Sequence, residues 1–191
     1  MRWSTAFSKI ERRDLTRRGA LTGAETTRVG MRGRYAEYRV RLAGNAGMTV
    51  TGRLLVPSGG RPPFAAVLLN DGRELNSRAV EALPREFGDV VALSLDYPEA
   101  LPYEVKVGAL LRRQDELRDL ARRIPSAFSL GGAYLAGRAD VDGARVALVA
   151  TSFAVPFAVI AASLDSTFRN VALIYGAGDF PGVLDQHRGQ H

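Results

Sequence analysis

The sequence predicts an α/β fold in which a mixed sheet is covered by helices on both faces. Two segments with strand-like alternation come first, and four short apolar runs then alternate with segments of helical character. Apolar runs of strand length between helices are typical of strands buried on both faces, and this order of elements implies helices on each side of the sheet. The 191 residues suffice for one domain with a sizeable core.

The opening elements are predicted to form a β-hairpin and a buried strand. Apolar and charged side chains alternate in residues 35–43 and again in residues 48–56, and a Gly-Asn-Ala-Gly turn separates the two runs. This pattern indicates two antiparallel strands. After a Pro- and Gly-rich loop, residues 64–69 are continuously apolar. We expect them to form a strand that is buried on both faces.

The middle of the chain is predicted to alternate helix, strand and helix. A short helix is expected over residues 76–83 because Pro84 would end it, and the next strand over residues 89–95. The prolines that follow Tyr97 and Leu101 indicate a rigid connection to the strongest helical segment. That segment, residues 103–124, has apolar residues at three- and four-residue steps.

The 20 residues that follow, with their Gly131-Gly132 pair, are predicted to be looser in structure. An apolar strand is then expected over residues 146–151, and a helix over residues 154–164, with Pro156 in its first turn. A last buried strand is predicted over residues 171–175.

The basic residues of the chain concentrate near its start. The net charge is +6, and Lys9 and Lys106 are the only lysines. The arginine-rich residues 1–34 are predicted to be a solvated, partly helical extension, with a phosphate-binding arm as the alternative. The Arg17-Arg18 pair lacks the apolar segment of an export signal, and no run approaches the roughly 18 apolar residues of a membrane helix. We therefore expect a cytoplasmic protein that binds neither membrane nor nucleic acid.

One serine is placed for chemistry. Ser152 ends the strand of residues 146–151 and stands between Ala150 and Ala154, where the usual nucleophile-elbow pattern has glycines. Small residues are needed there because the strand and the next helix pass close together. The elbow would expose the serine hydroxyl and aim the helix N-terminus at a developing oxyanion. The alternative is that Thr151-Ser152 is an ordinary helix cap.

Several segments together carry a resemblance to a known family. They are the hairpin, Val67-Leu-Leu-Asn-Asp-Gly-Arg73, Asp96-Tyr97-Pro98, Val141-Asp-Gly-Ala-Arg-Val-Ala-Leu-Val-Ala-Thr-Ser-Phe-Ala154 and Val171-Ala-Leu-Ile-Tyr-Gly-Ala-Gly-Asp179. In these segments the chain resembles the α/β hydrolases, most of all the dienelactone-hydrolase and acyl-esterase branch. The resemblance covers residues 35–180 and implies a three-layer, α/β-hydrolase-like fold whose C-terminal strands are missing, with residues 181–191 as a tail.

The resemblance also implies roles for individual residues. Ser152 would be the nucleophile that forms an acyl-enzyme with a small carboxylic ester. The N–H of Phe153 would be one oxyanion donor, and the N–H of Gly72 or Arg73 the second. The acid would be Asp179 and the base His187, with Asp185 and His191 as the other candidates in the tail. No cofactor and no metal are implied.

Two hypotheses of other classes remain open from the sequence. The chain could be a non-catalytic α/β domain that binds a ligand at its strand ends or a partner at the exposed sheet edge of residues 171–175, including a second copy of itself. It could also bind nucleic acid through residues 1–34, with an affinity that falls steeply with salt.

Overall fold

A computed structural model describes residues 20–44, 47–71, 76–83, 88–97 and 114–175, with the backbone alone for residues 76, 82 and 114–121. Seven strands, two 3₁₀-helices and two α-helices make up this part of the chain. In chain order they are β1 (Leu21–Arg32), β2 (Tyr35–Gly44), β3 (Thr49–Pro57), β4 (Phe64–Asn70), η1 (Asn76–Ala82), β5 (Val90–Leu95), α4 (Gln114–Ala136), β6 (Val141–Thr151), η2 (Ser152–Ala154), α5 (Val155–Leu164) and β7 (Asn170–Ile174).

All seven strands belong to one mixed sheet in the order β1-β2-β3-β5-β4-β6-β7. The strands from β1 to β3 form an antiparallel meander, and β3 also pairs antiparallel with β5. The strands β5, β4, β6 and β7 are parallel. The carboxyl ends of these four strands therefore meet at one edge of the sheet.

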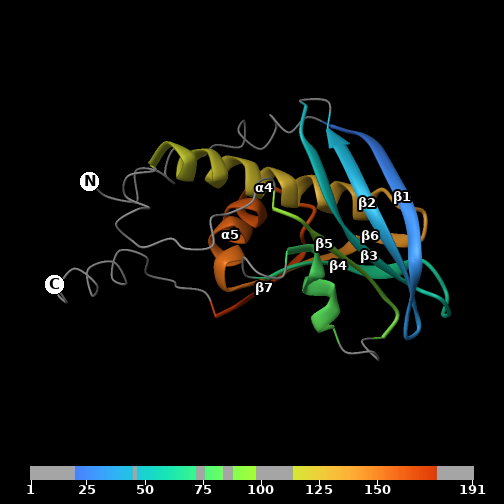
Figure 1. Cartoon of the computed structure of the whole chain (residues 1–191). Helices are drawn as coiled ribbons and strands as arrows, with labels where there is room; N and C mark the ends of the chain where they lie inside the picture. The colour runs from blue at the N-terminus through green and yellow to red at the C-terminus, as the bar shows by residue number, and fades with distance from the viewer. Residues whose placement is uncertain (1–19, 45–46, 72–75, 84–87, 98–113, 176–191) are drawn as a thin grey trace.

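Helices cover both faces of the sheet, so the described residues form three layers (Figure 1). The helices α4 and α5 lie side by side on one face, over the larger core cluster, whose fully buried members include Leu68, Leu93, Phe128 and Leu148. The short helix η1 lies on the other face, over a smaller cluster built around Leu55, Val67 and Val80. This layering confirms the predicted mixed sheet with helices on both faces.

Most of the predicted elements are confirmed within a residue or two. The hairpin of residues 35–43 and 48–56 is β2 and β3, and the first two apolar runs after it are β4 and β5. The strand predicted over residues 146–151 is β6, which begins five residues earlier, at Val141. The short helix before Pro84 is present as the 3₁₀-helix η1. The helix after Ser152 is α5, and its proline lies in the first turn, where the missing N–H has no helical partner to lose.

The partly helical extension predicted for residues 1–34 is wrong in its last part. Residues Leu21–Arg32 form β1, which pairs with β2 from Leu21 opposite Gly44 to Arg32 opposite Tyr35. Gly33 turns the chain between the two strands with a φ of +60°, a conformation that suits glycine. Residues 1–19 lie outside the described part of the chain.

The helix predicted over residues 103–124 continues further along the chain than expected. Residues 98–113 lie outside the described part, and α4 continues past Pro125 to Ala136. The glycine pair that suggested a loop is a point of close packing. A Cβ on Gly131 would lie 2.9 Å from Leu95 Cδ1, and a Cβ on Gly132 would lie 2.7 Å from Phe168 Cζ.

The last predicted strand is present as β7, but it is not buried. Val171, Leu173 and Ile174 are each more than two-fifths exposed. Among the described strands, β7 pairs with β6 alone and stands at the end of the sheet. The expectation of a buried strand is therefore wrong for the described residues, whereas the expected apolar edge is observed.

Candidate active site

The candidate site lies at the edge where the parallel strands end. The strand β6 runs directly into Ser152, β4 runs into Asp71, and β5 is followed by Asp96 and Tyr97. The strand β4 stands between β5 and β6, with Asn70 opposite Ala150. Ligands of open α/β sheets bind outside the carboxyl ends of such strands.

Ser152 adopts a backbone conformation that side-chain-bearing residues rarely adopt. Its φ is +49°, whereas Thr151 before it is extended with a φ of −123° and a ψ of 149°. The chain reverses within this residue, and its carbonyl then accepts a hydrogen bond from the N–H of Val155. Ser152 is exposed. A strained, exposed serine between a strand and a helix is the geometry of a nucleophile elbow.

The residues two positions before and two positions after Ser152 are small and fully buried. Ala150 on β6 and Ala154 at the end of η2 both have no exposed surface. Both pack in the core between the sheet and the helices α4 and α5. Alanine therefore serves at the two positions where the usual elbow has glycine.

Phe153, the residue after Ser152, contacts two other aromatic rings. The ring of Phe153 meets the Tyr97 ring edge-on, with centroids 5.6 Å apart and an interplanar angle of 86°. On its other side it packs against Phe157 of α5 at 5.2 Å. Such edge-to-face contacts stabilise an arrangement beyond the area that they bury. From the sequence, only the backbone N–H of Phe153 was expected to have a role. The packing of its ring between Tyr97, which follows β5, and Phe157 of α5 was not predicted.

Polar groups lock the ends of β4 and β5 together beyond the last residues of the ladder. The buried Asn70 side chain donates to the carbonyl of Leu95 at 2.9 Å, and Ser94 Oγ donates to the carbonyl of Leu69 at 2.5 Å. The hydroxyl of Tyr97 donates to the carbonyl of Asp71 at 2.5 Å. Burial, and secondarily the Asp71 carboxylate, raise the pKa of Tyr97 well above its ordinary value, so this hydroxyl stays a donor.

The fold of the chain is similar to that of solved esterase structures. Acetyl xylan esterase 1 from a Thermoanaerobacterium species superposes with a TM-score of 0.74 and 17% identity, over 98% of this chain and 62% of that one. The acetyl xylan esterase from a Paenibacillus species gives 0.64 and 18% identity, over 98% of this chain and 68% of that one. A cold-adapted esterase from an Arctic intertidal metagenomic library gives 0.56 and 13% identity, over 81% and 63%.

The chain has an α/β-hydrolase fold. At these identities the likeness concerns the fold, and the chain spans about three-fifths of the length of the first of these structures. No family model matches the sequence, and no curated protein matches it.

The structure describes two of the predicted site residues, which are consecutive in the chain, and the others lie outside the described part. Ser152 and Phe153 form the serine turn. The second oxyanion donor, Gly72 or Arg73, and the acid and base, Asp179 and His187, lie outside the described residues. Tyr97, which the sequence placed in a rigid connection and in one of the segments that carry the resemblance but gave no role in the site, is the additional residue that the structure brings to this edge.

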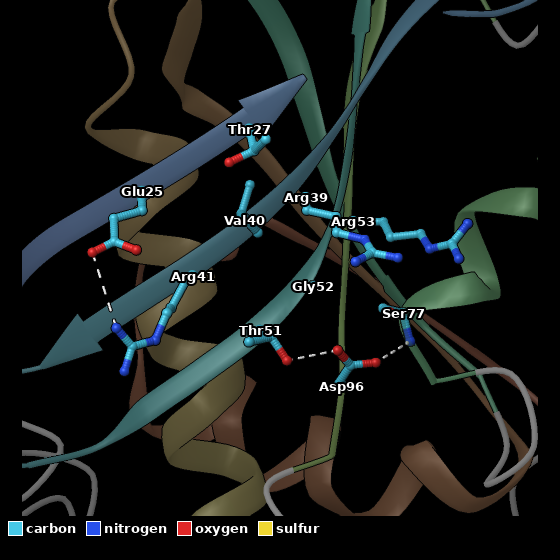
Figure 2. A pocket seen from close by; sticks show the side chains of 10 residues that line it. All are labelled: Glu25, Thr27, Arg39, Val40, Arg41, Thr51, Gly52, Arg53, Ser77 and Asp96. Carbon is cyan, nitrogen blue, oxygen red and sulfur yellow. Dashed lines mark hydrogen bonds and ion pairs between the residues drawn. The ribbon is translucent and has the colours of Figure 1, made fainter. Parts of the chain in front are cut away.

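A separate hollow of about 400 Å³ opens on the η1 face of the sheet (Figure 2). Its lining includes three arginines from β2 and β3, namely Arg39, Arg41 and Arg53, but neither Ser152 nor Phe153. Arg53 is paired with Glu37 and Glu81, and Arg41 lies 4.0 Å from Glu25. The charges of this hollow are therefore largely balanced within the protein.

Asp96 connects this hollow to the serine edge. Its carboxylate accepts the hydroxyl of Thr51 at 2.7 Å and the N–H of Ser77 at 3.3 Å, as the dashed lines in Figure 2 show. In turn the N–H of Asp96 donates to the carbonyl of Thr51 at 2.8 Å. These bonds fix Asp96, the residue before Tyr97, to β3 on one side and to η1 on the other.

Neither described α-helix is long and apolar enough to cross a membrane.

Proposed function

We propose that this chain is a serine ester hydrolase, with Ser152 as the nucleophile. The single observation that supports this most is the exposed Ser152 at a φ of +49°, directly after a core strand, with fully buried alanines two positions before and two positions after it. A strained left-handed conformation persists only where the surrounding structure enforces it, and such residues concentrate at active sites.

The proposed reaction is acyl transfer. Ser152 Oγ attacks the carbonyl carbon of the ester while its proton passes to a base, and the oxyanion accepts the N–H of Phe153 and the N–H of Gly72 or Arg73. Collapse of this intermediate breaks the bond to the alcohol, which leaves with the proton from the base. Water then hydrolyses the acyl-enzyme by the same steps and releases the carboxylic acid.

The proposed reaction also needs a base and an acid that orients it. Asp179 and His187 are the candidates in this chain, and a base from a second subunit is the alternative. The proposed substrates are esters of small carboxylic acids, because two of the similar structures are acetyl xylan esterases. We also propose a cytoplasmic location, as expected from the sequence.

Covalent labelling by a fluorophosphonate probe tests the proposal. We expect labelling of the native chain, and none of a Ser152→Ala variant or of a heat-denatured sample. A His187→Ala variant that is labelled much more slowly would assign the base. A natively folded chain that is never labelled would show that Ser152 is not activated.

The second candidate function is partner binding at the β7 edge. It is favoured by the exposed apolar side chains of Val171, Leu173 and Ile174 on a strand at the end of the sheet. Under this function a Ser152→Ala variant would bind its partner as well as the wild-type chain does.

A further inference from the structure

The geometry points to a binding site for a small hydroxycarboxylate in the hollow on the η1 face of the sheet, with Arg39 and Arg41 as the residues that hold its carboxylate. The hollow is separate from the serine edge, because its lining includes neither Ser152 nor Phe153. Its volume of about 400 Å³ lies within the range of roughly 300–1,000 Å³ that is usual for small-molecule sites. Binding there is independent of the proposed ester hydrolysis.

The floor of the hollow is built by the register of the first three strands (Figure 2). Because side chains alternate along a strand, Arg39 and Arg41 of β2 point to the η1 face, whereas Val40 between them is buried in the larger core. Side chains of β1 and β3 flank both arginines on this face. The in-register neighbours are Thr27 and Arg53 for Arg39, and Glu25 and Thr51 for Arg41.

Arg39 has a charge that no carboxylate of the described residues pairs with. Its side chain is exposed, and it stands directly opposite Arg53 in the ladder. Arg53 is itself held by Glu37 at 3.1 Å and Glu81 at 2.9 Å. Like charges directly opposite each other on neighbouring strands are destabilising. An anion bound beside Arg39 would relieve this repulsion.

Arg41 supplies the second guanidinium. It lies two residues from Arg39 on the same face of β2, and its only printed partner among the described residues is Glu25, at 4.0 Å. Both side chains of this pair are more than half exposed, and exposed pairs of this kind contribute little to stability. A ligand carboxylate therefore replaces Glu25 at little cost. The planar fork of a guanidinium matches the two oxygens of a carboxylate.

The acidic side chains of the hollow decide which anion fits. Asp96 and Glu25 both belong to the lining, and they would repel a dianion such as phosphate more strongly than a monocarboxylate. The Asp96 carboxylate accepts the hydroxyl of Thr51 and the N–H of Ser77. A carboxylate has about four acceptor sites, so Asp96 also has room for ligand hydroxyl groups. One carboxylate with neighbouring hydroxyl groups therefore complements this lining.

Gluconate is the probe, because it combines a single carboxylate with several hydroxyl groups. It is titrated into the isotope-labelled wild-type chain at constant ionic strength, and the arginine side-chain N–H signals are followed by NMR. Acetate, glucose and phosphate are titrated in the same way, as the carboxylate alone, the hydroxyl groups alone and the dianion. We expect saturable shifts with gluconate at millimolar concentrations, and binding at least about tenfold weaker for each of the other three.

An Arg39→Gln variant tests the assignment to the hollow, and Arg28→Gln is the matched control. Arg28 is exposed on β1 and pairs in register with Tyr38, which packs against the larger core on the opposite face. Both variants therefore lose one charge from the same sheet. Arg39→Gln should weaken gluconate binding about tenfold or more, and Arg28→Gln should stay within about twofold. Ser152→Ala should bind gluconate as the wild-type chain does.

Gluconate that binds no more tightly than acetate or glucose, or less tightly than phosphate, overturns the inference. Binding that Arg39→Gln leaves unchanged does the same, and binding lost in Ser152→Ala would place the ligand at the serine edge instead. The titrations of the wild-type chain decide even where Arg39→Gln does not fold. Labelling by the fluorophosphonate probe tests the proposed function separately, so either proposal can fail alone.

Discussion

Ser152 holds a backbone conformation that is unfavourable for any residue with a Cβ. An L-residue in the left-handed region costs about 1–2 kcal/mol, whereas glycine loses only roughly 0.5–1 kcal/mol through its extra backbone entropy. With Ser152 at a φ of +49°, Ser152→Gly should be more stable than Ser152→Ala by roughly 0.5–1 kcal/mol. Urea unfolding of the two variants measures this difference.

The opposite order is expected at a matched position in α5. Val159 is exposed in the middle of that helix, where Val159→Ala should be more stable than Val159→Gly by about 1 kcal/mol. If Ser152→Ala were more stable than Ser152→Gly, the left-handed conformation of Ser152 would not hold in solution.

The pKa of Tyr97 predicts an alkaline loss of stability. Because the folded chain raises this pKa above the ordinary value near 10, it keeps a proton that the unfolded chain has lost at high pH. The contribution of this proton to the free energy of unfolding is complete below about pH 9. It falls as the pH rises through about 10 towards the folded-state pKa of Tyr97, by at most about 1.4 kcal/mol per pH unit. Urea unfolding between about pH 8 and about pH 11 should show a smaller fall for Tyr97→Phe than for the wild-type chain.

At the scale of single residues, the sequence could predict the turn at Ser152 but not the contact of Tyr97 with Asp71. An apolar strand followed by a serine between small residues is a local pattern, and the structure places Ser152 in the expected turn. The contact between Tyr97 and Asp71 spans 26 residues and depends on β5 pairing next to β4. No local pattern contains that information. The roles of Gly72, Arg73, Asp179 and His187 stay predictions.

Among the elements, α4 depends on a glycine that packing requires. Gly131 faces Leu95, Leu68 and Leu93, and a Cβ there would lie 2.9 Å from the first and 3.4 Å from the other two. All three leucines are fully buried, so they have little room to move. Gly131→Ala should therefore lower the free energy of unfolding by about 1–3 kcal/mol, although alanine is the better helix former.

A glycine in open space provides the control. A Cβ on Gly59 would meet nothing within 4 Å, and the backbone there has no positive φ. Gly59→Ala should therefore leave stability unchanged or raise it by up to about 1 kcal/mol. A Gly131→Ala variant as stable as the wild-type chain in urea unfolding would contradict the close packing of α4 on the sheet.

The elements that the sequence missed are those that tertiary packing decides. In β1 the residues from Thr22 to Arg28 are exposed, so the strand lacks the apolar alternation that identifies β2. It is held by its backbone pairing with β2. The second half of α4 contains Pro125 and two glycines, which locally favour a loop, but its buried Phe128, Leu130 and Leu135 fix it against the sheet.

The whole molecule brings the candidate site together through its sheet order. Because β4 is the central strand of three parallel neighbours, the chain segments after β4, β5 and β6 emerge at one edge, although they are far apart in sequence. The core on the α4 side and the smaller core under η1 fix this sheet from both faces. The order of elements was predictable from alternating strand and helix patterns, and so was the exposed apolar edge at residues 171–175, which β7 forms in the described sheet.

That edge makes a prediction about association. Leu173 is 45% exposed on β7, at the end of the described sheet, and apolar edge strands pair readily with other chains. We expect the wild-type chain to self-associate as its concentration rises, and Leu173→Lys to shift it towards monomer while unfolding within about 0.5 kcal/mol of wild type. Light scattering after size exclusion measures the association, and urea unfolding the stability.

Val29→Lys, on the opposite edge strand β1, is the control, since Val29 is 55% exposed. Loss of association in Val29→Lys alone would assign the contact to β1 instead.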